Sequence, residues 1–179
     1  AKGTGRGKLG GGGLHVGNHG VAVWGTLENA RKAVDMGVDF IVLTGNPGVG
    51  VTNRAIEETL AAGRTACVLV PEISLTPQTV ARFRGRFGDL VAVMHSRMSQ
   101  GERYDQWDFI RSGAARVVVG ARSALFTPLS NLGLIVIDEE HEGSYKQDSA
   151  PRYHARDVAV WMARRAGAAV VLGKRHALH

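Results

Sequence analysis

The sequence of 179 residues has one cysteine, Cys67, and no apolar run long enough to cross a membrane. A single thiol excludes an internal disulfide and favours a reducing compartment, so we expect a cytoplasmic protein. A transmembrane helix needs about 20 predominantly apolar residues, and the N-terminus shows no signal-peptide pattern, so we expect no membrane partner. Cys67 itself lies in an apolar strand pattern, and we interpret it as a core residue.

The chain carries 22 basic and 16 acidic residues, for a formal net charge of +6. This surplus permits a polyanionic partner without requiring one. Hydrophobic residues make up 44% of the chain, which is enough for the core of one domain. We expect a flexible glycine-rich lead over residues 1–19, a single α/β domain over residues 20–173 and a polar tail over residues 174–179.

Apolar strand patterns and amphipathic helix patterns alternate about six times along the chain. This alternation is typical of an α/β fold in which helices cover both faces of a mostly parallel sheet, here of about six strands. A capping-box pattern at Ser99 predicts the start of one helix. The spacing of Tyr104, Trp107 and Ile110 in that helix predicts that all three face the core.

The strand pattern at residues 134–137 ends in an acidic cluster. Its residues are apolar without alternation, which is typical of a strand buried on both faces of a parallel sheet. Asp138 and Glu139 follow at once, and ligands of open α/β sheets bind at such carboxyl ends. The pair suits a nucleotide hydrolase that gives one carboxylate to Mg²⁺ and another to the attacking water. An exposed acidic strand end is the simpler alternative.

A glycine-rich segment joins another buried strand pattern, residues 40–43, to a helix. Such a segment lets backbone N–H groups approach a phosphate and can offer a hydroxyl to Mg²⁺, and the positions concerned are Gly45, Gly48, Gly50 and Thr52. Val51 stands where phosphate-loop hydrolases carry lysine, and Pro47 removes one N–H donor. A tight turn without a ligand therefore explains the pattern equally well.

A long ordered series of motifs runs from Arg54 to Gly173. It includes residues 71–78 (PEISLTPQ), 120–126 (GARSALF), 138–141 (DEEH), 144–147 (SYKQ) and 152–157 (RYHARD). This series resembles the first motor lobe of the primosomal replication-restart DNA helicases of superfamily 2. The resemblance implies a three-layer, RecA-like domain of the P-loop NTPase type that uses ATP and Mg²⁺ and binds single-stranded or forked DNA.

The resemblance also implies roles for individual residues. Asp138 and Thr52 would bind Mg²⁺, Glu139 would orient or activate water, and the three glycines would hold the nucleotide. DNA would lie on the sheet edge and on an aromatic-rich loop that couples DNA binding to ATP hydrolysis; the implied contacts are Ser74, Thr76, Arg122, Ser123, Tyr145, Lys146, Arg152 and Tyr153. Both tyrosines would stack on bases, although Tyr153 packing in the core is the alternative.

The sequence departs from this family at two motifs. Val51 replaces the phosphate-loop lysine, and residues 173–176 (GKRH) replace the Gly-Ser-Ala-Thr motif after the last strand. The second motor lobe, its arginine finger and the N-terminal DNA-binding domain have no counterpart in this sequence. We therefore expect a lobe disabled for catalysis that keeps weak nucleotide or single-stranded DNA binding and self-associates through its exposed surface.

Residues 20–52 follow the helicase pattern poorly and more weakly resemble a βα unit of a (β/α)₈ barrel. Three alternatives therefore stay open. The chain is a structural chimera, natural or engineered, with no native activity; or it is a nucleic-acid-binding module without nucleotide chemistry; or residues 45–52 bind a phosphorylated metabolite as in a barrel.

Overall fold

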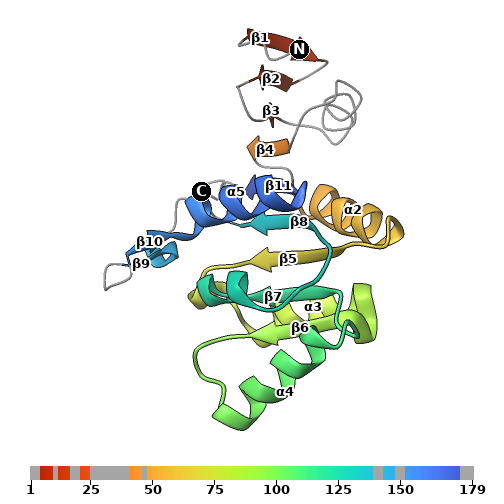
Figure 1. The fold of residues 1–179 in the computed structure, drawn as a ribbon, viewed down its shortest axis with the longest axis vertical. Helices are drawn as coiled ribbons and strands as arrows, with labels where there is room; N and C mark the ends of the chain where they lie inside the picture. The colour runs from red at the N-terminus through yellow and green to blue at the C-terminus, as the bar shows by residue number, and fades with distance from the viewer. Residues whose placement is uncertain are drawn as a thin grey trace.

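The computed structural model describes residues 5–9, 12–16, 21–24, 41–45, 48–138, 143–147 and 152–173. Its described strands form a nine-stranded sheet in the order β1-β2-β3-β4-β11-β8-β5-β7-β6, which Figure 1 shows as a ladder, and a separate β9–β10 pair. The strands are β1 (Gly5–Leu9), β2 (Gly12–Val16), β3 (Val21–Trp24), β4 (Ile41–Gly45), β5 (Thr65–Leu69), β6 (Val91–Met94), β7 (Val117–Gly120), β8 (Leu132–Ile137), β9 (Lys146–Gln147), β10 (Tyr153–His154) and β11 (Ala169–Gly173). The helices are α2 (Gly48–Ala61), α3 (Pro77–Phe87), α4 (Gln100–Arg111) and α5 (Ala155–Ala166), with short 3₁₀ helices η1 (Glu72–Ser74), η2 (Gly88–Leu90), η3 (Arg122–Phe126) and η4 (Gly143–Tyr145).

The strands from β3 to β6 in this order all run parallel, while β1 and β2 add an antiparallel ribbon to β3. The strand predicted at residues 134–137 lies within β8, where Val136 pairs with Val68 of β5 on one side and Val171 of β11 on the other. All four of its predicted apolar residues are buried. The predicted α/β fold with a mostly parallel sheet is therefore confirmed.

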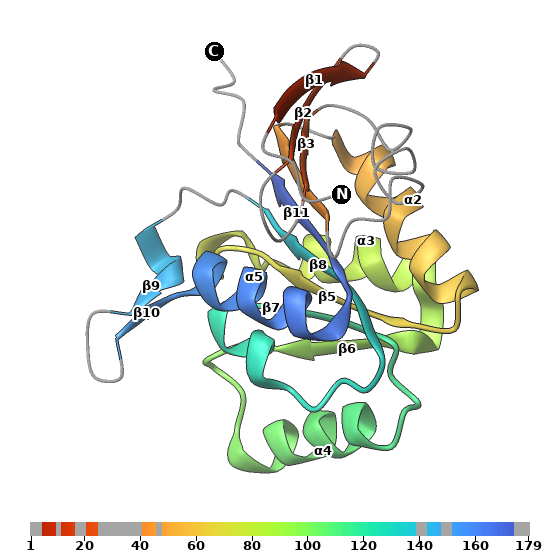
Figure 2. The ribbon, with the colours of Figure 1, turned by 45° about the horizontal axis from the view of Figure 1, so that its top comes forward.

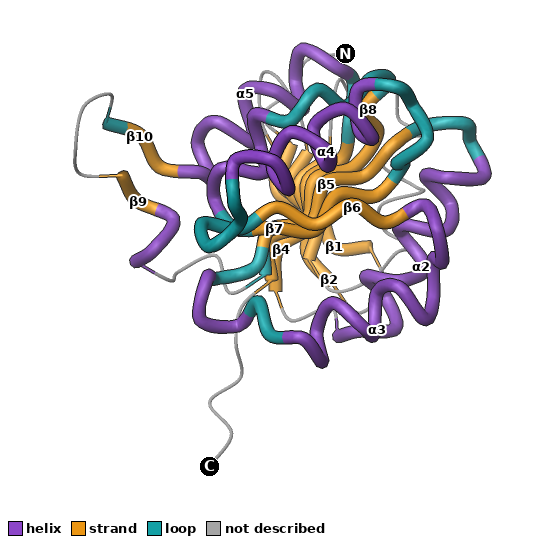
Figure 3. The backbone as a smooth tube through the Cα atoms, turned by 90° about the horizontal axis from the view of Figure 1, so that it is seen from below, coloured by secondary structure: helices purple, strands orange, loops and turns teal. Residues whose placement is uncertain are grey.

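Helices cover both faces of the sheet (Figures 2 and 3). Helices α2 and α3 pack on one face, in a cluster that includes Ile56, Val68, Phe87, Val119 and Val136. Helices α4 and α5 pack on the other, in a cluster that includes Cys67, Ile110, Val118, Ile135 and Ala159. Because alternate residues of a strand face opposite sides, strands between two helix layers must be apolar throughout. Within the described ranges, no helix has the length and apolar character to cross a bilayer.

Helix α4 begins as predicted but turns a different side to the sheet. The Ser99 hydroxyl caps the helix by accepting the Glu102 N–H at 3.2 Å. Ile110 is buried, but Tyr104 is 67% exposed and Trp107 is 41% exposed. The prediction that both aromatic rings face the core is wrong. The side of α4 that faces the sheet carries Gln106 and Ile110 instead, and the Gln106 side chain accepts the Val93 N–H of β6.

Two pairs of strands form where the sequence indicated none. Residues 5–9 and 12–16, within the expected flexible lead, pair as β1 and β2. Residues 146–147 and 153–154, within the segment expected to form the aromatic-rich loop, pair as β9 and β10, which Figure 1 shows beside the main sheet. Glycine-rich and polar segments have weak strand propensity, so pairing partners rather than local sequence decide their conformation.

Cys67 is a core residue, as predicted. It lies on β5 with 2% of its surface exposed, and its Sγ lies 3.7 Å from the Ala124 carbonyl oxygen. Burial raises the pKa of the Cys67 thiol from 9.0 to about 12, because the thiolate would lose its hydration. The folded chain therefore keeps this thiol protonated under conditions in which an unfolded chain ionises it.

We expect Cys67 to resist iodoacetamide in the folded chain and to react in concentrated guanidinium chloride. We also expect its contribution to the free energy of unfolding to be fully present below pH 9.0 and to be lost as pH rises from 9.0 toward about 12. Thermal unfolding of the parent and of Cys67→Ala across this range measures the difference. A folded parent that alkylates as fast as the unfolded chain contradicts this expectation.

Candidate nucleotide and nucleic-acid site

Four neighbouring parallel strands deliver the predicted nucleotide residues to one edge of the sheet. Gly45 ends β4 and pairs with Gly173 at the end of β11, and β11 pairs in turn with β8. Asp138 follows β8 directly, and its N–H donates to the carbonyl of Leu69, at the end of β5, at 2.9 Å. The carboxyl ends of β4, β11, β8 and β5 thus lie side by side, where open α/β sheets bind ligands.

The backbone of Asp138 is held at both of its polar groups. Its N–H is bound to Leu69, and its carbonyl oxygen accepts the Tyr145 hydroxyl at 2.6 Å. The residue itself is exposed. These two hydrogen bonds fix the backbone from which the carboxylate projects, which is what a metal ligand requires.

Glycine at residue 173 leaves the Asp138 carboxylate uncrowded at the end of β11. A Cβ atom built on Gly173 would lie 3.1 Å from Oδ1 of Asp138. Such a contact is tighter than ordinary van der Waals distance, so any larger residue would push the carboxylate aside. The close approach to Asp138 therefore explains glycine at residue 173. This explanation does not depend on the altered residues 174–176 that follow it.

Helix α2 starts earlier than predicted. Gly48, Gly50 and Thr52 lie in its first turns rather than in a loop, since the helix begins at Gly48. Glycine permits a loop but does not impose one, and the buried residues Ala55 and Ile56 hold the segment against the sheet as a helix. A helix N-terminus carries unpaired N–H groups and a positive potential, and both suit a phosphate.

The oxygen atoms at this edge suit Mg²⁺ and the N–H groups of the α2 N-terminus suit a phosphate, with one deficit. A carboxylate at Asp138 and a hydroxyl at Thr52 are hard ligands of the kind that Mg²⁺ prefers. Val51 supplies no ammonium group to a phosphate bound at the α2 N-terminus. Glu139, predicted to orient water, lies outside the described residues. The residues therefore fit a nucleotide with its metal, but with fewer charge-assisted contacts than a phosphate loop normally provides.

A second group of predicted residues gathers around Arg122, at the start of η3. Its Nη1 donates to the Lys146 carbonyl at 2.9 Å, and its guanidinium lies over the Tyr153 ring, 5.5 Å from the centroid. The Phe126 ring meets the Tyr153 ring edge-on, with centroids 5.4 Å apart. Both geometries are favourable. These four residues, Arg122, Phe126, Lys146 and Tyr153, are called the Arg122 cluster below.

A hollow of about 500 Å³ adjoins the Arg122 cluster. Its lining comes from β9, β10 and the start of α5, and comprises Lys146, Gln147, Arg152, Tyr153, His154 and Asp157. Three of the predicted DNA contacts share this hollow, and Ser123 lies exposed next to Arg122 in the sequence. Cationic and aromatic side chains grouped in this way suit a single strand, because phosphates pair with the cations and bases stack on the rings.

The position of η3 depends on Gly120. A Cβ atom at residue 120 would lie 2.5 Å from the Met94 carbonyl oxygen and 2.7 Å from the Ala124 Cβ. Because these contacts are so short, no other residue fits at position 120 unless the backbone shifts. The glycine at the end of β7 thus lets the chain fold sharply into η3, which brings Arg122 to the carboxyl edge of the sheet.

Ser74 and Thr76 lie at the same edge, after β5, where their polar groups serve the local fold. Thr76 caps α3, because its Oγ1 accepts the Thr79 N–H at 3.2 Å, and the Thr79 hydroxyl donates to the Ser74 carbonyl at 3.0 Å. Ile73 beside them is 84% exposed. Nothing in the sequence pointed to an exposed Ile73, because an isoleucine normally indicates core.

The structure corrects the role predicted for Tyr145. Its side chain is 1% exposed and packs in the core beneath α5, so neither face of the ring is open to a base. Phe126, which was not among the predicted DNA contacts, is 50% exposed and offers the accessible ring. A tyrosine in a polar segment does not reveal whether its ring is buried, because its apolar body and polar tip suit both environments.

A model of the DEAD/DEAH box helicase family matches residues 34–165 of the chain. The chain is similar to the "Replication restart protein PriA" of Bacillus subtilis, with 57% identity over 151 residues that cover 82% of this chain and 19% of that protein. It is similar to PriA of Haemophilus influenzae, with 48% identity over 140 residues, 76% of this chain and 19% of that protein. The chain thus spans about a fifth of the length of these curated relatives.

Among solved structures, the chain is similar to the C-terminal domain of S. cerevisiae Dbp5, with a TM-score of 0.48 and 15% identity over 74% of this chain and 75% of that one. It is also similar to the Pyrococcus furiosus Hef helicase domain, with a TM-score of 0.45 and 16% identity over 83% of this chain and 29% of that one. The resemblance predicted from the motifs is confirmed by the family match and the PriA relatives. The chain belongs to the DEAD/DEAH box helicase family.

Proposed function

We propose that this chain is the first motor lobe of a replication-restart DNA helicase, with single-stranded DNA bound at the Arg122 cluster and a weakened nucleotide site at Asp138. The observation that carries the proposal is the hydrogen bond from Tyr145 to the Asp138 carbonyl, because it joins the two sites. Residue 51 is valine rather than the lysine of a phosphate loop, and we therefore expect weak nucleotide binding and inefficient hydrolysis.

In the proposed nucleotide site, Asp138 and Thr52 hold Mg²⁺, and the first turn of α2 receives phosphates through backbone N–H groups. Mg·ATP, when bound, supplies the phosphoryl group, and its metal neutralises the charge that develops during transfer. Glu139 follows Asp138 and orients the water. A hydrogen bond to a charged group contributes about 1.5–3 kcal/mol, so the missing lysine costs at least about ten-fold in affinity.

In the proposed DNA site, Arg122 is the principal phosphate ligand and Phe126 the principal stacking ring. The Lys146 carbonyl and the Tyr153 ring hold the Arg122 side chain at the carboxyl edge of the sheet. Such preorganisation lowers the entropic cost of binding a phosphate, because the long side chain is already ordered. Base stacking on an exposed aromatic ring contributes about 1–3 kcal/mol and tolerates any sequence.

Few contacts separate the two sites. Arg122 binds the carbonyl of Lys146, the preceding residue is Tyr145, and the Tyr145 hydroxyl binds Asp138. A DNA phosphate bound to Arg122 shifts this side chain together with the Lys146 carbonyl that it holds, at the start of β9, and Tyr145 transmits the shift to Asp138. Coupling of this kind is reciprocal, so a nucleotide must change the affinity for DNA by the same factor.

A nucleic-acid-binding module without nucleotide chemistry is the second candidate. It is favoured by the combination of an assembled Arg122 cluster with an apolar residue, Val51, at the phosphate loop. A structural chimera would bind neither ligand. Calorimetry with nucleotide and titration with DNA distinguish these three cases.

We expect Mg·ATP to bind the parent chain weakly and the Val51→Lys variant about ten-fold or more tightly, because an ammonium group restores a charge-assisted contact to the phosphates. Isothermal titration calorimetry measures both affinities. Val51→Leu, which changes the apolar side chain without adding charge, is the matched control. No binding by either the parent or Val51→Lys would contradict the nucleotide site, and equal binding by the two would contradict its weakening at residue 51.

We expect Arg122→Ala to weaken binding of an oligo-dT strand and to reduce the slope of log affinity against log salt by about 0.7, the value for one phosphate contact on a single strand. Fluorescence anisotropy at several salt concentrations measures this slope. Arg111→Ala is the control, because Arg111 is an exposed arginine of α4 that pairs with Asp108. Equal effects of the two substitutions would argue against a DNA site at the Arg122 cluster.

We expect Tyr145→Phe to uncouple the two ligands while leaving the packing of the ring in place. In the Val51→Lys background, Mg·ATP affinity is measured with and without saturating oligo-dT. The hydroxyl accounts for a hydrogen bond of about 1 kcal/mol, so the phenylalanine variant should lose a DNA-dependent difference of up to about five-fold. Tyr104→Phe, at an exposed residue, is the control. A DNA-dependent difference that survives in Tyr145→Phe would refute the proposed connection.

A further inference from the structure

Two hollows follow one another along β6, the last strand of the sheet. The larger has a volume of about 910 Å³ and includes Val93 of β6, and the smaller has a volume of about 410 Å³ and includes Val91. Arg84 of α3 lines both. The two hollows, with Arg84 between them, are called the β6 groove below and are defined by these lining residues. The volume of each lies in the range of sites that hold a small ligand, about 300–1,000 Å³.

The backbone of β6 faces this groove at every second residue. The N–H groups of Arg116 and Ala121, on either side of β7, donate to the carbonyls of Leu90 and Met94 at 2.9 and 3.3 Å. In a parallel ladder alternate residues bond to the same neighbour, so the intervening Val91 and Val93 direct their N–H and C=O groups toward the open edge. The groove therefore lies along a row of main-chain hydrogen-bonding groups.

A side chain from α4 already bonds to this edge. The Oε1 atom of Gln106 accepts the Val93 N–H at 2.9 Å. The side-chain amide thus occupies the position that a peptide carbonyl from a neighbouring strand would take. An exposed edge is commonly blocked in this way, and a flexible glutamine is displaced more easily than a strand.

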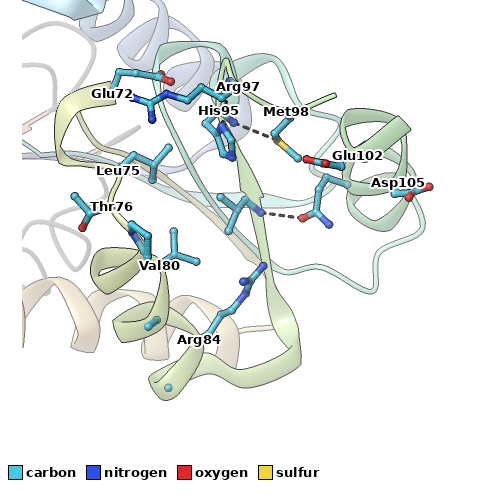
Figure 4. A pocket seen from close by; sticks show the side chains of 15 residues that line it. Glu72, Leu75, Thr76, Val80, Arg84, His95, Arg97, Met98, Glu102 and Asp105 are labelled. Atoms are coloured by element: carbon cyan, nitrogen blue, oxygen red, sulfur yellow. Dashed lines mark hydrogen bonds between the residues drawn. The ribbon is translucent and has the colours of Figure 1, made fainter. Parts of the chain in front are cut away.

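The walls of the groove differ in chemistry. Figure 4 shows α3 on one side, with Val80 and Arg84, and α4 on the other, with Glu102 and Asp105. A strand added to β6 directs alternate side chains toward opposite faces of the sheet. One set would meet the apolar surface of α3, and the other would meet the two carboxylates of α4.

The charge of the groove selects its ligand. Four carboxylates and two guanidinium groups line the two hollows, namely Glu72, Asp89, Glu102, Asp105, Arg84 and Arg97. This negative balance, in a chain of net charge +6, disfavours a nucleic-acid strand. A second copy is disfavoured too, because two-fold antiparallel pairing of β6 with itself would bring the α4 carboxylates of both copies together.

We propose that the β6 groove binds an extended segment of a partner protein, which pairs with β6 as an added strand and sets basic side chains against Glu102 and Asp105. Alternate residues of this segment are apolar and face Val80 on α3. Main-chain bonds to Val91 and Val93 supply affinity, and the charged wall supplies specificity. Gln106 leaves the Val93 N–H when the segment binds.

The first test uses a fluorescein-labelled, end-blocked peptide of alternating lysine and valine, titrated by anisotropy against the full chain. We expect it to bind, and the same peptide with glutamate for lysine to bind at least about ten-fold more weakly. The double substitution Glu102→Lys with Asp105→Lys should reverse this preference. Asp108→Lys is the matched control, because it makes the same change on the same helix at a residue that lines neither hollow.

The second test needs no protein variant and asks whether the peptide binds as a strand. N-methylation of every second amide should abolish binding for one alternate set, whose N–H groups face β6, and leave binding nearly unchanged for the other. Failure of all peptides to bind, equal binding of the lysine and glutamate peptides, or equal effects of the two methylation patterns would each overturn the proposal. So would displacement of the bound peptide by oligo-dT.

Discussion

The parallel pairing of β8 with β5 and β11 is the constraint on which the other features depend. It buries β8 on both faces, so polar residues begin only after the strand, at Asp138. The same pairing aligns the ends of β5, β8, β11 and β4, which sets the α2 N-terminus, Asp138 and the segment after β5 along one edge. The Tyr145 hydroxyl then ties the η4–β9 segment to that edge through Asp138.

The two proposed binding regions use different parts of this sheet. The carboxyl edge carries cationic and aromatic groups that suit phosphates and bases, and β6 carries a groove with an acidic wall. Glycines permit the close approaches that this arrangement requires. Gly120 lets η3 fold against β6 and bring Arg122 to the edge, and Gly173 leaves space for the Asp138 carboxylate.

The α/β fold, the buried strand at residues 134–137 and the helicase resemblance could be predicted from the sequence. Residues 134–137 are an unbroken apolar run, and the motifs occur in a fixed order. The positions of single side chains were less predictable. Periodicity favoured Trp107 as a core residue, but α4 turns Gln106 and Ile110 toward the sheet instead. Tyr145 lies in a polar segment, and its burial reflects both its packing beneath α5 and its hydrogen bond to the Asp138 carbonyl, neither of which the local sequence shows. Phe126 contacts the Tyr153 ring of β10, a strand that the sequence did not predict.

The central claim is that DNA bound at the Arg122 cluster acts on Asp138 through the segment that contains Tyr145. Hydrogen exchange of the backbone amides, followed by mass spectrometry with and without oligo-dT, tests it most directly. We predict slower exchange in residues 122–126 and 143–147 and, with them, at Asp138, whose N–H is bound to Leu69. Slower exchange confined to residues 122–126, or located away from all three segments, would contradict the account.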